Sequence, residues 1–485
     1  MAKAGRSQHI LGIYFALSAL CSLLALIWIL AVPSEAGSVS LLGYSWGRLG
    51  FALLTAGAAL FFLYMAIRFS RPSSAQLLTS SLIRFLDTGN AAPWAGIVAL
   101  LGYLIGVIFL FTSLPIMGGP YYPPRLLPVA TWLCALNLFN LLLLSVLVDD
   151  ARLPRLSHLL VLLVILLASV LVNINLWDFS TPAQEDIYST YIEGDRLLRG
   201  VNPYERVLDG DMRVNRKYAT YFPIFYYLSW WSQAAGLREF TAWLSLWRVV
   251  FLIFNLLIAA LLFYLPDRKG IAALALLAVL FWSFNRWTLH VARTFDLDFL
   301  PVYFMLLSLH LFKRNKLASY LLLGLSLGIK QMGIFLVPVY LIWTWQESGR
   351  HARRNLMVAI LAISSIPLIT SLPFMGWNLV GFLKSITFSA SRDPAAVFEA
   401  YSLDALLGVS GMYSKIPMLV LMALVYWLVW TGKTGRYLPA LLVMAVFVFF
   451  NSVLFTSYMV WIVPLILLTA YQILPYQTPN VELVS

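Results

Sequence analysis

The sequence predicts an all-α polytopic membrane protein with about 14 transmembrane segments, and three observations support this prediction. Hydrophobic residues make up 61% of the 485 residues and charged residues only 11%, whereas soluble domains contain about 45–50% apolar residues. Apolar runs of about 20 residues, the length of a membrane span, recur along the chain. Lys and Arg gather in the short loops after alternate runs, as the positive-inside rule requires. The net charge of +12 therefore reflects membrane topology, and nucleic acid is not expected as a partner.

The expected spans follow directly from these apolar runs. They lie at 9–32, 46–67, 94–113, 127–148, 156–176, 243–264, 271–292, 297–313, 317–329, 332–346, 355–374, 413–430, 437–453 and 457–473. The first run is longer than the apolar core of a cleaved signal peptide, so we expect it to remain as a span. Several late runs are short, which is expected of broken or tilted helices that line a cavity.

Basic residues set the expected orientation. They follow the second, fourth, sixth, eighth, tenth and twelfth spans: Arg68, Arg71, Arg84, Arg152, Arg155, Arg268, Lys269, Lys313, Arg314, Lys316, Arg350, Arg353, Arg354, Lys433 and Arg436. All of them face the cytoplasm if the N-terminus does. The sequence thus predicts a multi-pass protein of a cell membrane, in the simplest case a prokaryotic inner membrane, with both termini cytoplasmic. The long loops at 177–242 and 375–412 then lie on the extracytoplasmic side.

One polar stretch, 177–220, departs sharply from the rest of the chain because it is dense in Asp, Glu, Arg and Lys between apolar segments. The first four expected spans, residues 1–150, form an extension of unknown role, and the polar stretch lies in the remaining core, residues 151–485, which holds both long loops. Such a loop can perform chemistry on water-soluble groups at the membrane surface. The segment after it, 221–236, is apolar but short and rich in Trp and Tyr, and it is predicted to be an interfacial helix on the outer face.

The polar stretch begins as a predicted amphipathic helix. Thr181 is a good N-cap, Pro182 suits the first helical position, and Gln184 completes a capping box. Gly200 and Pro203 are expected to end the helix. The apolar residues at helical spacing are Ile187, Tyr188, Tyr191, Ile192 and Leu198, and they predict one packed face.

Glu185 and Asp186 fall in the first turn of this helix. Asp186 lies off the apolar stripe, so it can face an aqueous cavity and act as a general base, a role that accelerates reactions about 100- to 10,000-fold. The alternative is that both acids only complement the helix dipole.

A cationic cluster follows in the same loop. Arg213, Arg216 and Lys217 precede Tyr218 and Tyr221. Clustered cations beside aromatic rings can hold a phosphate and stack a sugar. The alternative is a solvated loop that faces lipid headgroups.

Charged residues also interrupt the later apolar runs. Lys330, followed by Gln331, lies between two half-length segments. A lysine there needs an anionic partner or a water-filled cavity, unless its stem snorkels to the interface. Asp296 and Asp298 lie between two spans on the expected outer side, where acids are costly unless they are hydrated or used; an ordinary polar helix end is the alternative.

Arg248 and Tyr458, near the outer ends of their spans, are weaker candidates because interfacial Arg and Tyr are common. The cysteines, Cys21 and Cys134, and the five histidines offer no metal-ligand spacing. Two acids, at 296 and 298, have the chemistry to bind a divalent cation, so the metal requirement is open.

The order of these motifs resembles the GT-C superfamily of integral-membrane glycosyltransferases, which includes the family 87 polyprenyl-phosphate-mannose-dependent mannosyltransferases and the protein O-mannosyltransferases. In that superfamily an acid opens an outer helix, and a GxxPY element, a Tyr/Pro element, an Arg, an acidic pair, a GLxxxxK segment and a late Tyr follow. The matching residues here are Glu185 and Asp186, Gly200–Tyr204, Tyr218 with Tyr221–Pro223, Arg248, Asp296 with Asp298, Gly324–Lys330, and Tyr458.

The resemblance implies a hexosyltransferase that moves a single sugar, with mannose favoured, from a polyprenyl-phosphate donor to a lipid or glycan acceptor with inversion. Asp186 is implied as the catalytic base. The residues implied to bind substrate or donor are Glu185, Tyr204, Arg213, Arg216, Lys217, Tyr218, Tyr221, Arg248, Asp296, Asp298, Lys330, Gln331 and Tyr458. No resident cofactor is implied with certainty, and a divalent metal is an open alternative.

Three rival functions fit the same composition. A transporter or flippase of lipid-linked saccharides would use a similar cavity but usually shows internal repeats, and none is evident. An oligosaccharide ligase would take a lipid-diphosphate donor and transfer a whole glycan. A structural or assembly subunit would keep the fold with a decayed site. The sugar, the acceptor, the lipid length and the oligomeric state are not fixed by the sequence.

Overall fold

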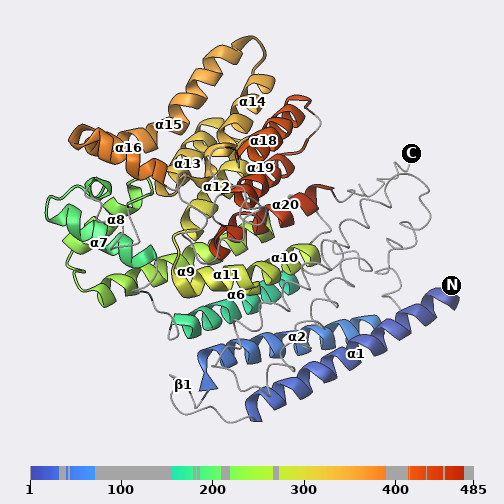
Figure 1. Ribbon diagram of the computed structural model, residues 1–485. Helices are drawn as coiled ribbons and strands as arrows, with labels where there is room; N and C mark the ends of the chain where they lie inside the picture. The colour runs from blue at the N-terminus through green and yellow to red at the C-terminus, as the bar shows by residue number, and fades with distance from the viewer. Residues whose placement is uncertain are drawn as a thin grey trace. The chain divides into compact units, whose positions relative to one another are not determined.

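The computed structural model describes most of the chain and shows it to be almost entirely helical (Figure 1). The described residues are 2–31, 40–41, 44–70, 155–177, 182, 186–208, 219–265, 272–388, 413, 415–432, 434–451 and 454–473. Predicted spans 94–113 and 127–148 lie outside them, as do Thr181, Gln184 and most of the loop 375–412.

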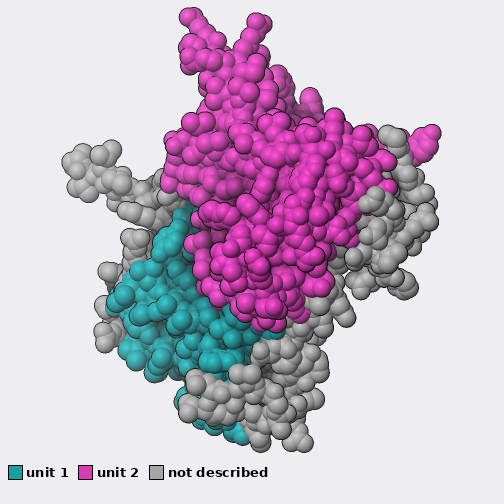
Figure 2. Space-filling model, turned by 90° about the vertical axis from the view of Figure 1, so that its left-hand side faces the viewer, with its two compact units in different colours: residues 1–179, 259–289, 467–485 teal, residues 180–258, 290–466 magenta. Residues whose placement is uncertain are grey.

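The chain forms two compact units, each of them discontinuous in sequence (Figure 2). Unit 1 comprises residues 1–179, 259–289 and 467–485, and unit 2 comprises residues 180–258 and 290–466. The residues that the sequence assigns to chemistry belong to unit 2. The role of residues 1–150 stays a prediction.

Unit 1 contains a helical hairpin. Helices α1 (Ala2–Ala31) and α2 (Trp46–Ser70) are joined by a two-stranded ribbon, β1 (Ser40–Leu41) with β2 (Tyr44–Ser45). Phe15, Phe62 and Met65, which are almost completely buried, form the core between α1 and α2. The other helices of this unit are α6 (Arg155–Trp177) and α10 (Ala272–Phe284), and both ends of α6 lie close to the predicted limits.

Unit 2 contains the remaining elements, although α9, α11 and α20 also extend into unit 1. In chain order they are α7 (Asp186–Leu198), η4 (Glu205–Val207), α8 (Ile224–Ala234), α9 (Phe240–Tyr264), α11 (Arg286–Thr294), α12 (Phe299–Leu311), α13 (Lys316–Ile329), η6 (Gln331–Leu336), α14 (Val337–Glu347), η7 (Gly349–His351), α15 (Ala352–Trp377), α16 (Leu379–Thr387), α18 (Lys415–Trp430), α19 (Tyr437–Phe450), η11 (Thr456–Trp461) and α20 (Val463–Ile473).

Five helical stretches of the described residues are long and apolar enough to cross a membrane, and the α10–α11 pair, bent by 44°, makes a sixth if it is one span. The five are Gly12–Ala31, Trp46–Arg68, His158–Trp177, Phe240–Tyr264 and Gly349–Trp377. Large apolar side chains on α15, such as Leu361 and Ile369, point away from the protein with more than half of their surface exposed. Outward-facing leucine and isoleucine are expected where the solvent is lipid. The class of an all-α membrane protein is thus confirmed, whereas the total of about 14 spans stays a prediction.

Two of the late predicted spans, 332–346 and 457–473, begin as 3-10 helix and continue as α-helix, in line with the expectation of broken helices. α13 ends at Ile329, Lys330 is extended with φ −149° and ψ 122°, and the 3-10 helix η6 continues the chain. The second break is the 3-10 helix η11, which precedes α20. Irregular backbone at membrane depth is tolerated where protein or a cavity, rather than lipid, surrounds it.

Helix α7 begins with Asp186 in its first turn and ends where the sequence predicted. Gly200 has φ 73° and its amide donates to the Leu197 carbonyl, while the Val201 amide donates to the Arg196 carbonyl. This Schellman motif requires a left-handed residue, which glycine adopts without strain.

The predicted packed face of α7 is confirmed in part: Ile187 is fully buried and Tyr191 packs against Trp243, but the most buried face also includes polar positions. The buried residues are Ile187, Thr190, Glu193 and Gly194, whereas Tyr188 is exposed. The reason is close packing against α8: a Cβ at Gly194 would lie 2.3 Å from Ser229 Oγ. Because glycine allows this approach, the face around Gly194 is buried against α8, while Tyr188 and Tyr191 of the apolar stripe contact Phe240 of α9.

Helix α8 has 11 residues, a length of about 16 Å, which is too short for a hydrocarbon core of about 30 Å. The predicted non-spanning helix at 221–236 is therefore consistent with the structure, and its place at the membrane interface stays a prediction.

Helices α13 and α15 pack closely through Gly324, and this contact predicts a stability effect. A Cβ at Gly324 would lie 2.5 Å from the Ile363 carbonyl oxygen, which is backbone and cannot rotate away. We expect Gly324→Ala to destabilise the protein by about 1–3 kcal/mol through overpacking, measured by thermal unfolding in detergent. Gly376→Ala in α15 is the matched control, since a Cβ there meets no atom within 4 Å. Equal melting temperatures for both variants would contradict the packing argument.

Candidate functional site

The site is built around Asp186 and Tyr221. Asp186 opens α7 and is half-buried, and its Oδ2 accepts a hydrogen bond of 3.1 Å from the Tyr221 hydroxyl. Burial, and next the neighbouring Asp186 carboxylate, raise the pKa of Tyr221 well above its usual value. The phenol therefore keeps its proton at neutral pH and remains a donor to Asp186.

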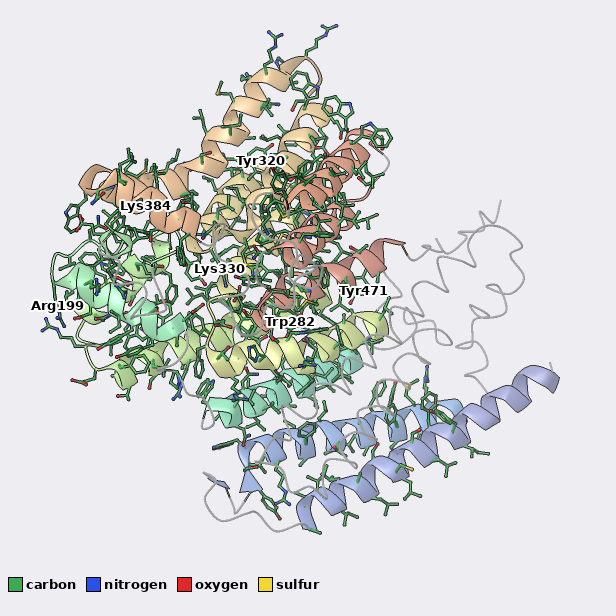
Figure 3. The ribbon with its side chains drawn as sticks, in the orientation of Figure 1. Arg199, Trp282, Tyr320, Lys330, Lys384 and Tyr471 are labelled. Carbon is green, nitrogen blue, oxygen red and sulfur yellow. The ribbon has the colours of Figure 1, made fainter. Side chains whose placement is uncertain are left out.

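Lys330 forms the second part of the site, in the interior of unit 2, whereas Arg199 points outward from the surface (Figure 3). The Lys330 Nζ donates to both carboxylate oxygens of Asp298, at 2.8 and 2.9 Å. The side chains of Lys330 and Asp298 are almost completely buried. The sequence predicted an anionic partner or a cavity for this lysine, and the structure gives it an anionic partner.

Two tyrosine rings lie against the Lys330 ammonium, and one of them belongs to the first part of the site. The Lys330 ammonium lies 5.2 Å from the ring centroid of Tyr221 and 5.4 Å from that of Tyr458. Both distances allow cation–π attraction. Tyr221 therefore contacts Asp186 through its hydroxyl and Lys330 through its ring.

A second partner of Asp298 comes from the 3-10 helix η11. The Trp461 indole Nε1 donates to Asp298 Oδ1 at 2.5 Å, and Trp461 is fully buried. We call the six residues joined by these contacts the Lys330 cluster: Asp186, Tyr221, Asp298, Lys330, Tyr458 and Trp461.

The backbone that carries Tyr221 is held by side chains from other elements. The side-chain amide of Gln331 donates to the Thr220 carbonyl at 2.6 Å, and the Ser385 hydroxyl donates to the Ala219 carbonyl at 2.6 Å. The Tyr204 hydroxyl donates to the Tyr221 carbonyl at 2.8 Å. These bonds satisfy the carbonyl oxygens of residues 219–221 and restrain the backbone that carries Tyr221.

Tyr204 and Gln331, both predicted to contact substrate, are thus found supporting Tyr221. Tyr204 is fully buried against Tyr226, Phe374 and Phe382, so it forms part of the packing beneath the site. Gln331 reaches the same segment from the start of η6.

Asp296 and Arg248 lie at a strained turn. Phe295, which is buried, has φ 56°, a value that costs a non-glycine residue about 1–3 kcal/mol and is concentrated at functional sites. The Arg248 guanidinium lies 5.0 Å from the Phe295 ring centroid. Asp296 Oδ2 accepts a hydrogen bond of 3.1 Å from the Thr294 hydroxyl. This turn leads directly into Asp298 at the start of α12.

Five predicted site residues lie outside the described residues: Glu185, Arg213, Arg216, Lys217 and Tyr218. The predicted cationic cluster at 213–217 therefore stays a prediction. Among the described residues, no group of three His, Cys, Asp or Glu side chains has the arrangement of a metal site.

Sequence reasoning missed Trp461, Ser385 and Tyr226. The Tyr226 hydroxyl accepts a hydrogen bond of 3.3 Å from the Tyr221 amide. The chain holds 17 tryptophans and 24 tyrosines, so residue type could not single out these side chains. The one available signal for Trp461 was its place three residues after Tyr458 in a short, broken span.

A buried ion pair beside the site also had no signal in the sequence analysis. Arg206 Nη1 donates to Glu193 Oε1, and both side chains are almost fully buried. The pair joins α7 to the 3-10 helix η4, so it anchors the helix that carries Asp186.

The cluster can perform two kinds of chemistry. The Asp186 carboxylate can accept a proton from a hydroxyl that approaches α7. Lys330 can donate hydrogen bonds to an anion, although its charge is already balanced by Asp298. An ammonium that is already paired with a carboxylate stabilises a bound anion less than an unpaired ammonium does. An anionic group bound here therefore requires further cations.

Comparison of the chain with protein-family models, with curated proteins and with solved structures finds no match. The resemblance to GT-C glycosyltransferases therefore rests on the order of the motifs alone.

Proposed function

We propose that the protein is a glycosyltransferase that moves a single sugar, with mannose favoured, from a polyprenyl-phosphate donor to a lipid or glycan acceptor. The observation that supports this best is the contact chain from Asp186 through Tyr221 to Lys330. In it, a proton acceptor accepts from the Tyr221 hydroxyl and a cation lies against the ring of the same residue. Transfer of a sugar from a phosphate needs these two groups, one at the attacking oxygen and one near the leaving group.

In the proposed reaction Asp186 takes the proton of the acceptor hydroxyl. The acceptor oxygen attacks the anomeric carbon, the bond from that carbon to the phosphate oxygen breaks, and polyprenyl phosphate leaves with the bonding electrons. Attack opposite to the leaving group inverts the anomeric centre. The Tyr221 hydroxyl holds the Asp186 carboxylate through the 3.1 Å hydrogen bond.

The leaving phosphate gains negative charge, so cations are needed near it. Lys330 is one candidate, and its partner Asp298 balances part of its charge. We assign the rest of the charge stabilisation to Arg248 and to the basic residues at 213–217. This division explains why the sequence concentrates basic residues in the loop that follows α7.

We further propose that the site faces the extracytoplasmic side of the membrane, with both termini in the cytoplasm and about 14 spans in total. The distribution of Lys and Arg supports this orientation. A donor dissolved in the membrane reaches such a site without a nucleotide-binding domain.

A transfer assay with purified protein tests the proposed function. Polyprenyl-phosphate mannose and polyprenyl-phosphate glucose are supplied as donors with extracted membrane lipids as acceptors, with and without EDTA. We expect one of the two donors to give a glycosylated lipid. A loss of this product in the presence of EDTA would establish a requirement for a divalent cation. Flux of the donor across proteoliposomes without any product would contradict the transferase and favour a transporter. Product only with a lipid-diphosphate glycan would favour a ligase.

A further inference from the structure

Trp461 and Trp243, two fully buried tryptophans of the described residues, differ in what their indole nitrogens bind. Trp461 lies at the end of η11, it is fully buried, and its indole N–H donates to a carboxylate. Trp243 in α9 is equally buried, but its indole nitrogen has no hydrogen-bond partner among the described residues. Burial in this protein therefore does not require an indole to bind an acid.

Both carboxylate oxygens of Asp298 accept hydrogen bonds from neighbouring side chains. Oδ1 accepts from both Lys330 and Trp461, and Oδ2 accepts from Lys330. Because Lys330 is a flexible donor, it would follow any rotation of the carboxylate. The rigid indole is the partner that fixes the orientation of the carboxylate.

The position of the Lys330 ammonium depends on this orientation. It lies within 5.4 Å of the ring centroids of both Tyr221 and Tyr458 while it contacts both oxygens of Asp298. Tyr458 and Trp461 belong to the same 3-10 helix, η11. One short segment thus supplies both a ring against the ammonium and the donor that holds its counter-ion.

We infer that Trp461 is a positioning residue for Lys330, acting through Asp298, in the proposed transfer reaction. The indole N–H fixes the carboxylate, the carboxylate fixes the ammonium, and the ammonium is held where the donor phosphate binds. This inference rests on the proposed function for its effect on catalysis. The geometric part, that Trp461 restrains Lys330, is independent of any reaction.

Transfer kinetics with polyprenyl-phosphate mannose as the varied substrate test the catalytic part. We expect Trp461→Phe to lower kcat/KM for the donor by about 10- to 100-fold, because a hydrogen bond to a charged group is lost. Trp243→Phe is the matched control, since it removes an indole of equal burial that binds no acid, and we expect a change of less than about threefold.

A double variant separates positioning from general damage. In a Lys330→Met background, Trp461→Phe should cause no further loss of kcat/KM, because residues that act through one another are not additive. Two losses that multiply would overturn the inference.

Chemical labelling of Lys330 distinguishes failure of this inference from failure of the proposed function. If the wild-type protein transfers no sugar, the proposed function fails, and acetic anhydride labelling of Lys330, followed by mass spectrometry, still tests the restraint. We expect faster labelling of Lys330 in Trp461→Phe than in the wild type and in Trp243→Phe. Equal rates in the three proteins would overturn the inference.

Discussion

Replacing Asp186 by asparagine is expected to lower kcat for sugar transfer by about 100- to 10,000-fold, the usual contribution of a general base. The amide has the shape of the carboxylate and can still accept the hydrogen bond from the Tyr221 hydroxyl, but it cannot take a proton. Folding should be unchanged, because Asp186 is only half-buried. The measurement is kcat with polyprenyl-phosphate mannose, together with the melting temperature in detergent.

Asp195→Asn is the control for this experiment, because Asp195 lies on the same helix. Its carboxylate forms a surface ion pair with Arg199 at 2.6 Å, and such pairs contribute about 0–1 kcal/mol. We expect Asp195→Asn to keep wild-type kcat. Wild-type kcat in the Asp186→Asn variant would show that Asp186 is a helix-dipole acid and not the base.

Much of the helical architecture could be predicted because membrane helices follow length and hydropathy. The span expected at 156–176 is α6 (Arg155–Trp177), and the one expected at 355–374 lies within α15 (Ala352–Trp377). Backbone groups in a membrane must be satisfied within the segment, so a long apolar run has one main structural solution. The breaks at Lys330 and at η11 were also indicated by short runs, since half-length segments cannot cross the membrane alone.

The side-chain contacts of α7 were harder to predict. Apolar spacing at Ile187, Tyr191 and Leu198 indicates which residues avoid water, but it does not identify the surface that the helix meets. That surface was determined by Gly194, whose missing side chain lets α8 approach, and by Arg206, a partner for Glu193 from outside the helix. Neither contact has a local sequence signal.

The same limit applies to the candidate site. The cost of a charge in an apolar run predicts that Lys330 has an anionic partner, but it does not choose Asp298 over Asp296. The choice depends on the packing of α12 against α13, which places Asp298 within 2.8 Å of the ammonium. Trp461 is 163 positions from Asp298, and only the fold brings the two together.

Breaking the Glu193–Arg206 ion pair is expected to give the largest stability change. In Arg206→Met the Glu193 carboxylate remains buried without the cation that donates to it, and such changes cost about 3–5 kcal/mol. Arg199→Met is the control, because Arg199 is exposed and its pair with Asp195 lies at the surface. We expect a much lower melting temperature in detergent for Arg206→Met and little change for Arg199→Met.

The loss should also depend on pH with a definite sign. Burial raises the pKa of Glu193, and the charges of Arg206 and Arg196 lower it by less, so the folded-state pKa lies above its usual value. A raised carboxyl pKa means that the folded state binds the proton more tightly than the unfolded state. The contribution of this group to stability is therefore present below the unfolded pKa and is lost as the pH rises through the folded pKa.

Removing Arg206 raises the folded-state pKa of Glu193 further, which makes this pH dependence steeper. Arg206→Met should therefore be closest to wild-type stability in acid and fall behind as the pH increases. The second variant, Arg206→Met with Glu193→Gln, should regain much of the loss at neutral pH, since no buried charge remains. A melting temperature of Arg206→Met that matches Arg199→Met at every pH would show that the ion pair does not anchor α7, and the support it gives to Asp186 would have to come from the packing of Gly194 against α8 instead.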